Sequence, residues 1–304
     1  MFTIDFHADD YAASRENSLR LIELVQTGRI DSMSVLCNIG CFHECMELLK
    51  EHWDGFPKKP LLSVHLNLID GYWLSSRGGK KIIHNSWERI FLHAAFGGPG
   101  KKQMEKSFTD EIAAQIAAFL KETAGLKDDA GEPLKLRIDS HVHTHMIPMV
   151  FDCLLDAIEQ HGLTERVQFI RCSTEPLFMF LTTPGIAGTI APVNLLKNVM
   201  LHVLSHPLRK RLGRMNIHTN RLFGIAMTGN MDEKRVSLLM DKMVNYAKKK
   251  DCRLEILSHP GRVIEEPRPE YGPADLHAFY APERDVEYAM LLSDVPGSVT
   301  ERLP

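Results

Sequence analysis

The chain has 304 residues, of which 44% are hydrophobic and 25% are charged, and its formal net charge is -3. This length and composition are typical of a globular protein with a sizeable core, arranged as one large domain or two small ones. A small negative charge without a long basic run argues against nucleic acid as a partner.

Other features argue against a membrane or secreted protein. The most apolar long stretch, 176–196, is interrupted by prolines, glycines and threonines, so no membrane span is expected. The start, MFTIDFHADD, lacks a basic segment followed by an apolar one, which predicts no secretory signal and a cytoplasmic location. The six cysteines do not follow the usual zinc or iron–sulfur spacings and are expected to be reduced and mostly buried.

The first half of the chain alternates strand and helix patterns. Phe2, Ile4 and Phe6 alternate with polar residues, as in a strand, whereas Ser14 can cap a helix that stops near Gly28. Extending this reasoning, we predict strands at 1–8, 31–38, 61–68 and 134–141, and helices at 14–29, 41–52, 108–126 and 148–162.

The second half continues the alternation after one interruption. Later strands are predicted at 167–173, 222–227 and 253–259, and later helices at 232–250 and 281–295. The segment at about 178–222 contains prolines and the basic cluster HPLRKRLGR. We interpret it as an inserted helical excursion, either a lid or an oligomer contact, with a solvated basic face as the alternative.

Repeated strand–helix units predict an α/β protein with a mainly parallel sheet and outer helices, closed into a barrel or near-barrel. Active sites of such folds lie at the carboxyl ends of the strands. Here four predicted strand ends carry an acid or an imidazole: Asp9 with Asp10, His65, His141 and His259. Their side chains are therefore expected to meet at one edge.

Two adjacent carboxylates repel each other, and a divalent cation bound to one of them relieves the repulsion. Imidazoles from two other strands can complete a three-ligand set with positions open for water, and the second carboxylate can accept the proton of that water. This arrangement predicts a metal-assisted hydrolase. The alternative is that Asp9 and Asp10 only cap the turn before Ser14.

The segment RIDSHVHTHM, residues 137–146, carries three histidines at alternate positions. His141 ends the predicted strand, at the edge where the candidate ligands are expected to meet. His143 and His145 follow in the loop and at the start of the next helix, where site lining and structural hydrogen bonding are both open. Asp139 shares the strand face of His141 and is placed to orient a ligand.

The motifs HADDYAAS, SMSVLCN, SVHLNL, RIDSHVHTHMIP and LSHPG occur along the chain in this order. In this order and spacing they resemble the YdjC-like carbohydrate deacetylase family, which includes the chitooligosaccharide deacetylases. The resemblance covers nearly the whole chain. Residues 1–304 are therefore expected to form a single domain. It implies a distorted TIM-like barrel that uses one divalent metal ion, zinc or magnesium, to remove acetyl groups from N-acetylated mono- or oligosaccharides. A homodimer is a further expectation from the family.

Carried over to this sequence, the resemblance makes Asp10, His65 and His141 the metal ligands and Asp9 the general base. His259 takes the place of a general acid or a group that polarises the substrate.

Two substrate-binding residues are expected, Arg171 and His143, with a structural ion pair as the alternative for Arg171. The sequence departs from the family pattern where His7 replaces the usual Asn and where Tyr11 and Ala12 replace Phe-Gly. A third departure lies near Ser63, where the family often has glycine. None of these changes removes a ligand, but they put the identity of the sugar in doubt.

Two other functions fit parts of the pattern. HVHTH is similar to motifs of metal-dependent phosphoesterases of the His-x-His barrel type, although those motifs usually lie on the first strand. A non-catalytic sugar-binding protein would keep the pocket without turnover.

Overall fold

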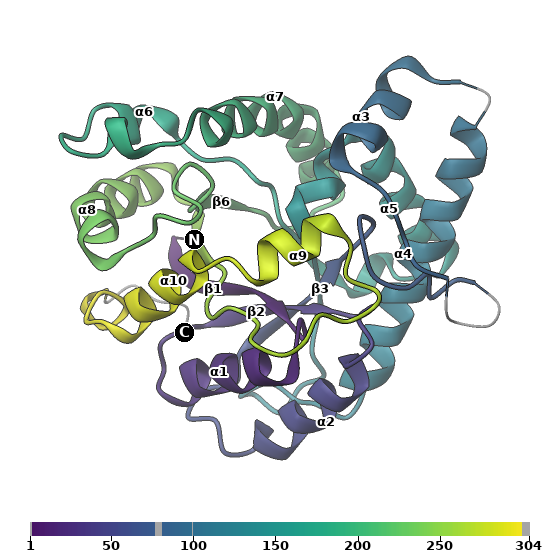
Figure 1. The fold of residues 1–304 in the computed structure, drawn as a ribbon, viewed down its shortest axis with the longest axis horizontal. Coiled ribbons are helices and arrows are strands. Elements are labelled where there is room, and N and C mark those ends of the chain that lie inside the picture. The colour runs from purple at the N-terminus through teal and green to yellow at the C-terminus, as the bar shows by residue number, and fades with distance from the viewer. Residues whose placement is uncertain (1, 77–80, 99, 300–304) are drawn as a thin grey trace.

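Seven parallel strands form one sheet in the order β5-β4-β3-β2-β1-β7-β6. The sheet is curled (Figure 1). The computed structural model describes residues 2–76, 81–98 and 100–299. The strands are β1 (Thr3–Tyr11), β2 (Ser32–Leu36), β3 (Leu61–Leu66), β4 (Leu136–Ser140), β5 (Val167–Ile170), β6 (Asn220–Phe223) and β7 (Arg253–Ser258). A single parallel bridge between Phe169 and His218 links β5 to the segment entering β6. The fold is a distorted TIM-like barrel, as predicted.

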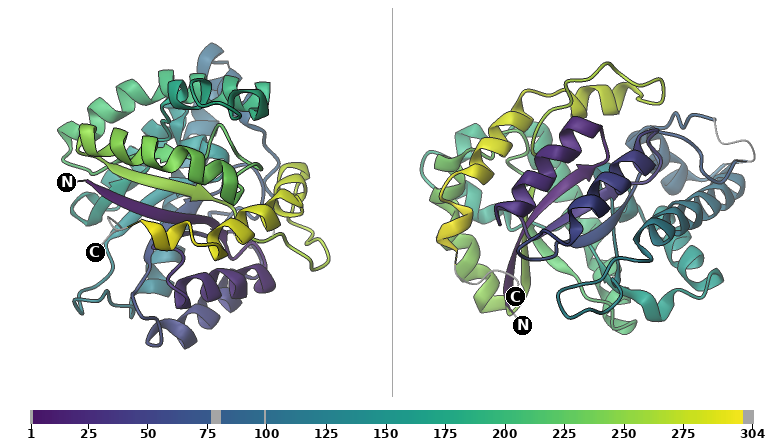
Figure 2. Two further views of the ribbon diagram at one scale, coloured as in Figure 1. Left: turned by 90° about the vertical axis from the view of Figure 1, so that its left-hand side faces the viewer. Right: turned by 90° about the horizontal axis from the view of Figure 1, so that it is seen from below.

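Helices pack around the sheet, and α9 lies beside the cavity (Figures 1 and 2). They are α1 (Arg15–Gln26), α2 (Phe42–Trp53), α3 (Trp87–Phe96), α4 (Lys101–Thr123), α5 (Pro148–Gln160), α6 (Leu177–Leu181), α7 (Pro192–Arg214), α8 (Glu233–Lys250), α9 (Pro273–Phe279) and α10 (Glu283–Leu292). The side chain of Ser14 accepts a hydrogen bond from the Asn17 N–H and caps α1, as its position in the sequence predicts. Among the described residues, no helix is both long and apolar enough to cross a bilayer.

The main differences from the predicted elements have local causes. β1 extends to Tyr11, three residues beyond the predicted strand. β6 ends at Phe223 because Gly224 adopts φ 143°, a conformation that residues with a side chain rarely adopt. The predicted excursion at 178–222 contains α7, most of α6 and the first residues of β6. α3 and α9 were not predicted.

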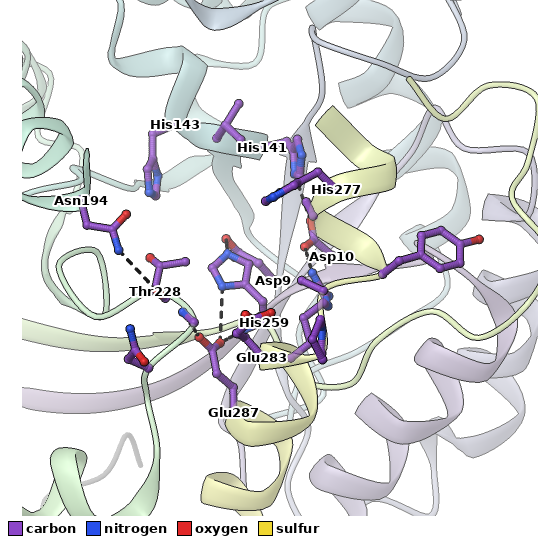
Figure 3. Close-up of a pocket in the computed structure, with 18 of the residues that line it drawn as sticks. Asp9, Asp10, His141, His143, Asn194, Thr228, His259, His277, Glu283 and Glu287 are labelled. Carbon is purple, nitrogen blue, oxygen red and sulfur yellow. Dashed lines mark hydrogen bonds and ion pairs between the residues drawn. The ribbon is translucent and has the colours of Figure 1, made fainter. Parts of the chain in front are cut away.

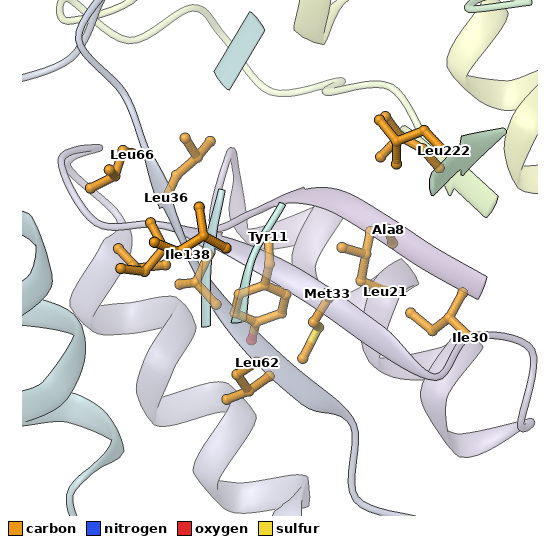
Figure 4. Packing of buried hydrophobic residues seen from close by; sticks show 14 of the residues in the cluster. Ala8, Tyr11, Leu21, Ile30, Met33, Leu36, Leu62, Leu66, Ile138 and Leu222 are labelled. Atoms are coloured by element: carbon orange, nitrogen blue, oxygen red, sulfur yellow. The ribbon is translucent and has the colours of Figure 1, made fainter. Parts of the chain in front are cut away.

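The apolar core lies between the sheet and its helices (Figure 4). On β1, Ile4, Phe6 and Ala8 belong to this core and are fully buried. The alternate residues of β1, Asp5, His7 and Asp9, are equally buried but contact polar groups of neighbouring strands. The inside of the curled sheet is therefore filled with hydrogen bonds and ion pairs rather than with aliphatic side chains. All six cysteines are free, and five of them are buried.

Candidate active site

Asp9 and Asp10 lie near the carboxyl end of β1 and line the same cavity of about 680 Å³ (Figure 3). Consecutive residues of a regular strand point to opposite faces. Here Asp10 adopts φ 69°, and the pairing register of β1 with β2 shifts between Ala8 and Tyr11. This left-handed, irregular backbone at the strand end brings two successive carboxylates to one site, and such strained positions are common at functional sites.

Asp10, His65 and His141 form a buried cluster whose ligand atoms all lie within 4.8 Å of one another. Asp10 Oδ1 is 3.4 Å from His65 Nε2 and 3.2 Å from His141 Nδ1. A tetrahedral ion with bonds of about 2.0–2.2 Å places its ligand atoms about 3.3–3.6 Å apart, close to these separations. The residues present therefore fit one divalent cation, with the cavity on its open side.

Each histidine of the cluster has a carboxylate at its other ring nitrogen. Asp139 Oδ1 lies 2.6 Å from His65 Nδ1, and Asp275 Oδ1, from α9, lies 3.3 Å from His141 Nε2. A carboxylate behind a histidine fixes the orientation and the tautomer of the ring, and this pairing is usual at metal sites.

The electrostatics of the cluster favour a positive charge at its centre. Burial alone would lower the pKa of His65, but Asp9, Asp10 and Asp139 outweigh burial and raise it to about 10. Burial alone would raise the pKa of Asp10, yet its hydrogen bonds to both histidines and the Arg284 guanidinium hold it well below the usual value. In this structure Arg284 Nη1 donates to Asp10 Oδ2 over 2.8 Å.

The side chains of Arg171 and His7 contact Asp9 on the side away from the cavity. Arg171 donates from Nη1 to Oδ2 over 3.0 Å and from Nη2 to Oδ1 over 2.8 Å, and His7 Nε2 lies 3.0 Å from Oδ1. Burial opposes ionisation of Asp9, but Arg171 and the histidines outweigh it and hold the pKa well below its usual range. The Arg171 side chain is fully buried and is not among the residues that line the cavity.

His259 follows β7 and lines the same cavity beside Asp9 (Figure 3). Its Nε2 lies 3.8 Å from Asp9 Oδ2, and its Nδ1 lies 3.5 Å from Glu287 Oε2. The same carboxylate oxygen accepts the His259 backbone N–H over 2.5 Å. Glu287 thus fixes both the backbone and the ring of His259, leaving Nε2 toward the cavity.

The two remaining histidines of the 137–146 segment have different surroundings. Val142 and His143 adopt left-handed backbone conformations, and His143 lines the cavity with Nδ1 at 3.0 Å from Ser173 Oγ. His145 is fully buried and bonded at both nitrogens, at 2.5 Å from Ser140 Oγ and 2.8 Å from the Arg171 carbonyl oxygen. Only His141 belongs to the metal-ligand cluster that faces the cavity.

The rest of the cavity offers both polar and apolar surface. Asn194 and Lys197 of α7 and Thr228 lie on one wall, whereas Leu276 and Tyr280 lie on another. Such a mixture is typical of pockets that enclose a small polar molecule with apolar faces.

Three residues of the site were missed in the sequence: Asp275, Arg284 and Glu287. Arg284 and Glu287 are three positions apart, which places them on one face of the helix predicted at 281–295. Asp275 lies on the short helix α9, and its contact with His141 spans a large part of the chain. Neither the helix nor that contact has a clear local signal.

The fold and the cavity define a barrel-like α/β protein with a buried His/Asp cluster, able to bind a metal ion, at the carboxyl ends of its strands. The family model described as YdjC-like protein matches residues 3–301, so the chain belongs to this family. The family membership indicated by the sequence motifs is confirmed.

Two relatives extend the comparison. The protein named Carbohydrate deacetylase from Clostridium beijerinckii is 25% identical over 218 residues, which cover 66% of this chain and 79% of the relative. The crystal structure of a candidate cellobiose-phosphate cleavage protein from Enterococcus faecalis V583 superposes with a TM-score of 0.55 and 16% identity. That alignment covers 97% of this chain and 92% of the other, and it supports the fold.

Proposed function

We propose that the protein is a metal-dependent hydrolase that removes acetyl groups from N-acetylated sugars or oligosaccharides, releasing acetate and an amino sugar. The observation that carries the proposal is the cluster of Asp10, His65 and His141, with ligand spacing for one cation, beside Asp9 and His259 in one cavity. Family membership and the relative named Carbohydrate deacetylase support the substrate class.

In this proposal Asp10, His65 and His141 hold a zinc or magnesium ion. When bound, such an ion supplies Lewis-acid polarisation of the acetamide carbonyl and lowers the pKa of a water molecule. Asp139 and Asp275 keep the two imidazoles oriented toward it.

Asp9 and His259 perform the proton transfers. Asp9 Oδ2 faces the cavity side of the site and takes a proton from the attacking water. His259 Nε2, held 3.8 Å from that oxygen by its contact with Glu287, gives a proton to the departing amine nitrogen. The acetyl carbon–nitrogen bond breaks, water supplies the new carboxylate oxygen, and the sugar keeps a free amine.

The substrate-binding surface is assigned to the two cavity walls. His143, Asn194 and Thr228 can bond sugar hydroxyls, and Leu276 and Tyr280 can pack on the apolar face of a sugar ring. Arg171 does not reach the cavity, because its side chain is buried against Asp9. We assign it to the positioning of Asp9 rather than to direct sugar contact.

The test is acetate release from N,N'-diacetylchitobiose after chelation and after re-addition of zinc or magnesium. We expect the added metal to restore release in the wild type and not in His141→Ala. Asp9→Asn should keep metal binding and lose at least about 100-fold in kcat, the usual contribution of a general base.

Three results would contradict the proposal. Near-native turnover by Asp9→Asn would remove Asp9 as the base. Absence of acetate release from a panel of acetylated sugars, with sugar binding retained, would favour a binding protein; hydrolysis of phosphate esters instead would favour the phosphoesterase alternative.

A further inference from the structure

His7 lies at the centre of a buried polar network directly behind Asp9. Its Nδ1 is 2.6 Å from Ser32 Oγ, and its Nε2 is 2.7 Å from Ser34 Oγ and 3.0 Å from Asp9 Oδ1. The side chain is fully buried, so water does not compete for these contacts.

The protons of the two serines are already committed to carboxylates. Ser32 Oγ donates to Asp5 Oδ1 over 2.5 Å, and Ser34 Oγ donates to Asp139 Oδ2 over 2.5 Å. A hydroxyl has one proton and an ionised carboxylate has none, so each serine oxygen can only accept from His7. Asp9 Oδ1, the remaining neighbour of Nε2, is also an acceptor. Both ring nitrogens of His7 therefore face acceptors only.

The charges around His7 agree with a second ring proton. The charged side chains in this network are Asp5, Asp9, Asp139 and Glu255, with Arg137, Arg171 and His65 opposite them. Two of the carboxylates lie close to His7 Nε2, Asp9 Oδ1 at 3.0 Å and Asp139 Oδ2 at 3.9 Å. Their negative charges favour the protonated form of the ring.

We infer that His7 is held as a doubly protonated imidazolium ion, and that this charge, together with Arg171, positions the Asp9 carboxylate. Arg171 binds both oxygens of Asp9, and His7 binds Oδ1, so Oδ2 is the oxygen with fewer donors and the one left for the substrate side. His7 does not line the cavity and acts through Asp9 alone. The role of Asp9 in turnover rests on the proposed function, whereas the protonation of His7 does not.

The protonation is tested by long-range ¹H–¹⁵N NMR of the zinc-loaded protein labelled only at histidine, at pH 8, above the pKa of free histidine of about 6.5. We expect both ring nitrogens of His7 to show the ¹⁵N chemical shifts of protonated nitrogens. The His7 signals are assigned by their loss in His7→Gln. One protonated and one bare nitrogen would overturn the inference. If the variant does not fold, neutron diffraction from the deuterated wild type gives the same answer, as a deuteron on each ring nitrogen.

The positioning role is tested by steady-state acetate release. His7→Gln should lower kcat by about 10- to 100-fold, the range found for residues that orient a reactive group, and leave KM within about threefold. His161→Gln, the same change at an exposed position, should leave both unchanged. An unchanged kcat in folded His7→Gln would overturn the positioning role. If the wild type itself releases no acetate, the proposed deacetylase function fails, and the NMR result still decides the protonation of His7.

Discussion

At the residue scale, the site depends on carboxylates that orient its histidines. Asp139 and Asp275 stand behind the two histidines of the cluster, and Glu287 stands behind His259. The direct site residues were predictable from the sequence because the carboxyl ends of parallel strands converge, so Asp9, Asp10, His65, His141 and His259 were expected together. Asp275 and Glu287 were not predicted, because they contact His141 and His259 from positions more than 25 residues away in the sequence.

Replacing Asp275 by Asn tests whether such a carboxylate matters for metal binding. The variant keeps the volume of the side chain but removes the carboxylate beside His141 Nε2, so His141 should be a weaker and less oriented ligand. We expect the affinity for zinc to fall by about 10- to 100-fold, measured by competition with a chelator dye. Asp156→Asn, the same change on the exposed face of α5, should bind zinc as the wild type does. Equal affinities in the two variants would contradict a role for Asp275 at the site.

At the element scale, strands were predicted better than helices. Residues 61–68 and 253–259 read as strands because they alternate apolar and polar positions, and β3 and β7 lie within these limits. α9 could not be recognised, because it is seven residues long and its N-terminus is held from elsewhere in the chain. Asp70 Oδ2 accepts the Asp275 N–H over 3.2 Å, so the start of α9 depends on the loop that follows β3.

The close approach of this loop to α9 requires a glycine at position 272. A Cβ atom there would lie 1.8 Å from Asp70 Oδ1 and 2.4 Å from its Cγ. The Asp70 carboxylate is buried and bonded to α9, so it cannot move aside without breaking that bond.

Gly272→Ala should therefore destabilise the protein by about 1–3 kcal/mol, the usual cost of overpacking, and weaken zinc binding because Asp275 moves with α9. Urea unfolding and a zinc titration measure the two effects. Gly125→Ala is the matched control, since a Cβ at Gly125 meets no atom within 4 Å. A wild-type urea midpoint in Gly272→Ala would show that the contact between Asp70 and α9 is not rigid.

At the scale of the whole molecule, buried neutral groups make stability depend on pH. Ser140 and the Arg171 carbonyl bond the two nitrogens of His145, and burial lowers the pKa of His145 to about 4. In the unfolded chain histidine titrates near pH 6.5. Between these values the unfolded state binds a proton that the folded state does not, so stability is present above about pH 6.5 and is lost as pH falls toward 4.

The wild type should lose about 2 kcal/mol more unfolding free energy than His145→Gln between pH 7 and pH 4.5, because the variant lacks this titration. Urea unfolding at the two pH values gives the difference. His161→Gln, at an exposed position, should follow the wild type at both. Parallel losses in wild type and His145→Gln would show that His145 is not held neutral.

The strand order has a consequence for how the protein is made. β1 carries Asp9 and Asp10 and pairs with β2 on one side and with β7 on the other. β1 is therefore synthesised long before β7, which begins at Arg253, and α9 and α10 follow later still. Long-range pairing of this kind slows folding and leaves strand edges exposed in the nascent chain. Asp275 on α9 and Arg284 on α10, which contact His141 and Asp10, are synthesised after every strand of the sheet. A chain arrested after β7 would therefore carry Asp10, His65 and His141 without these two partners.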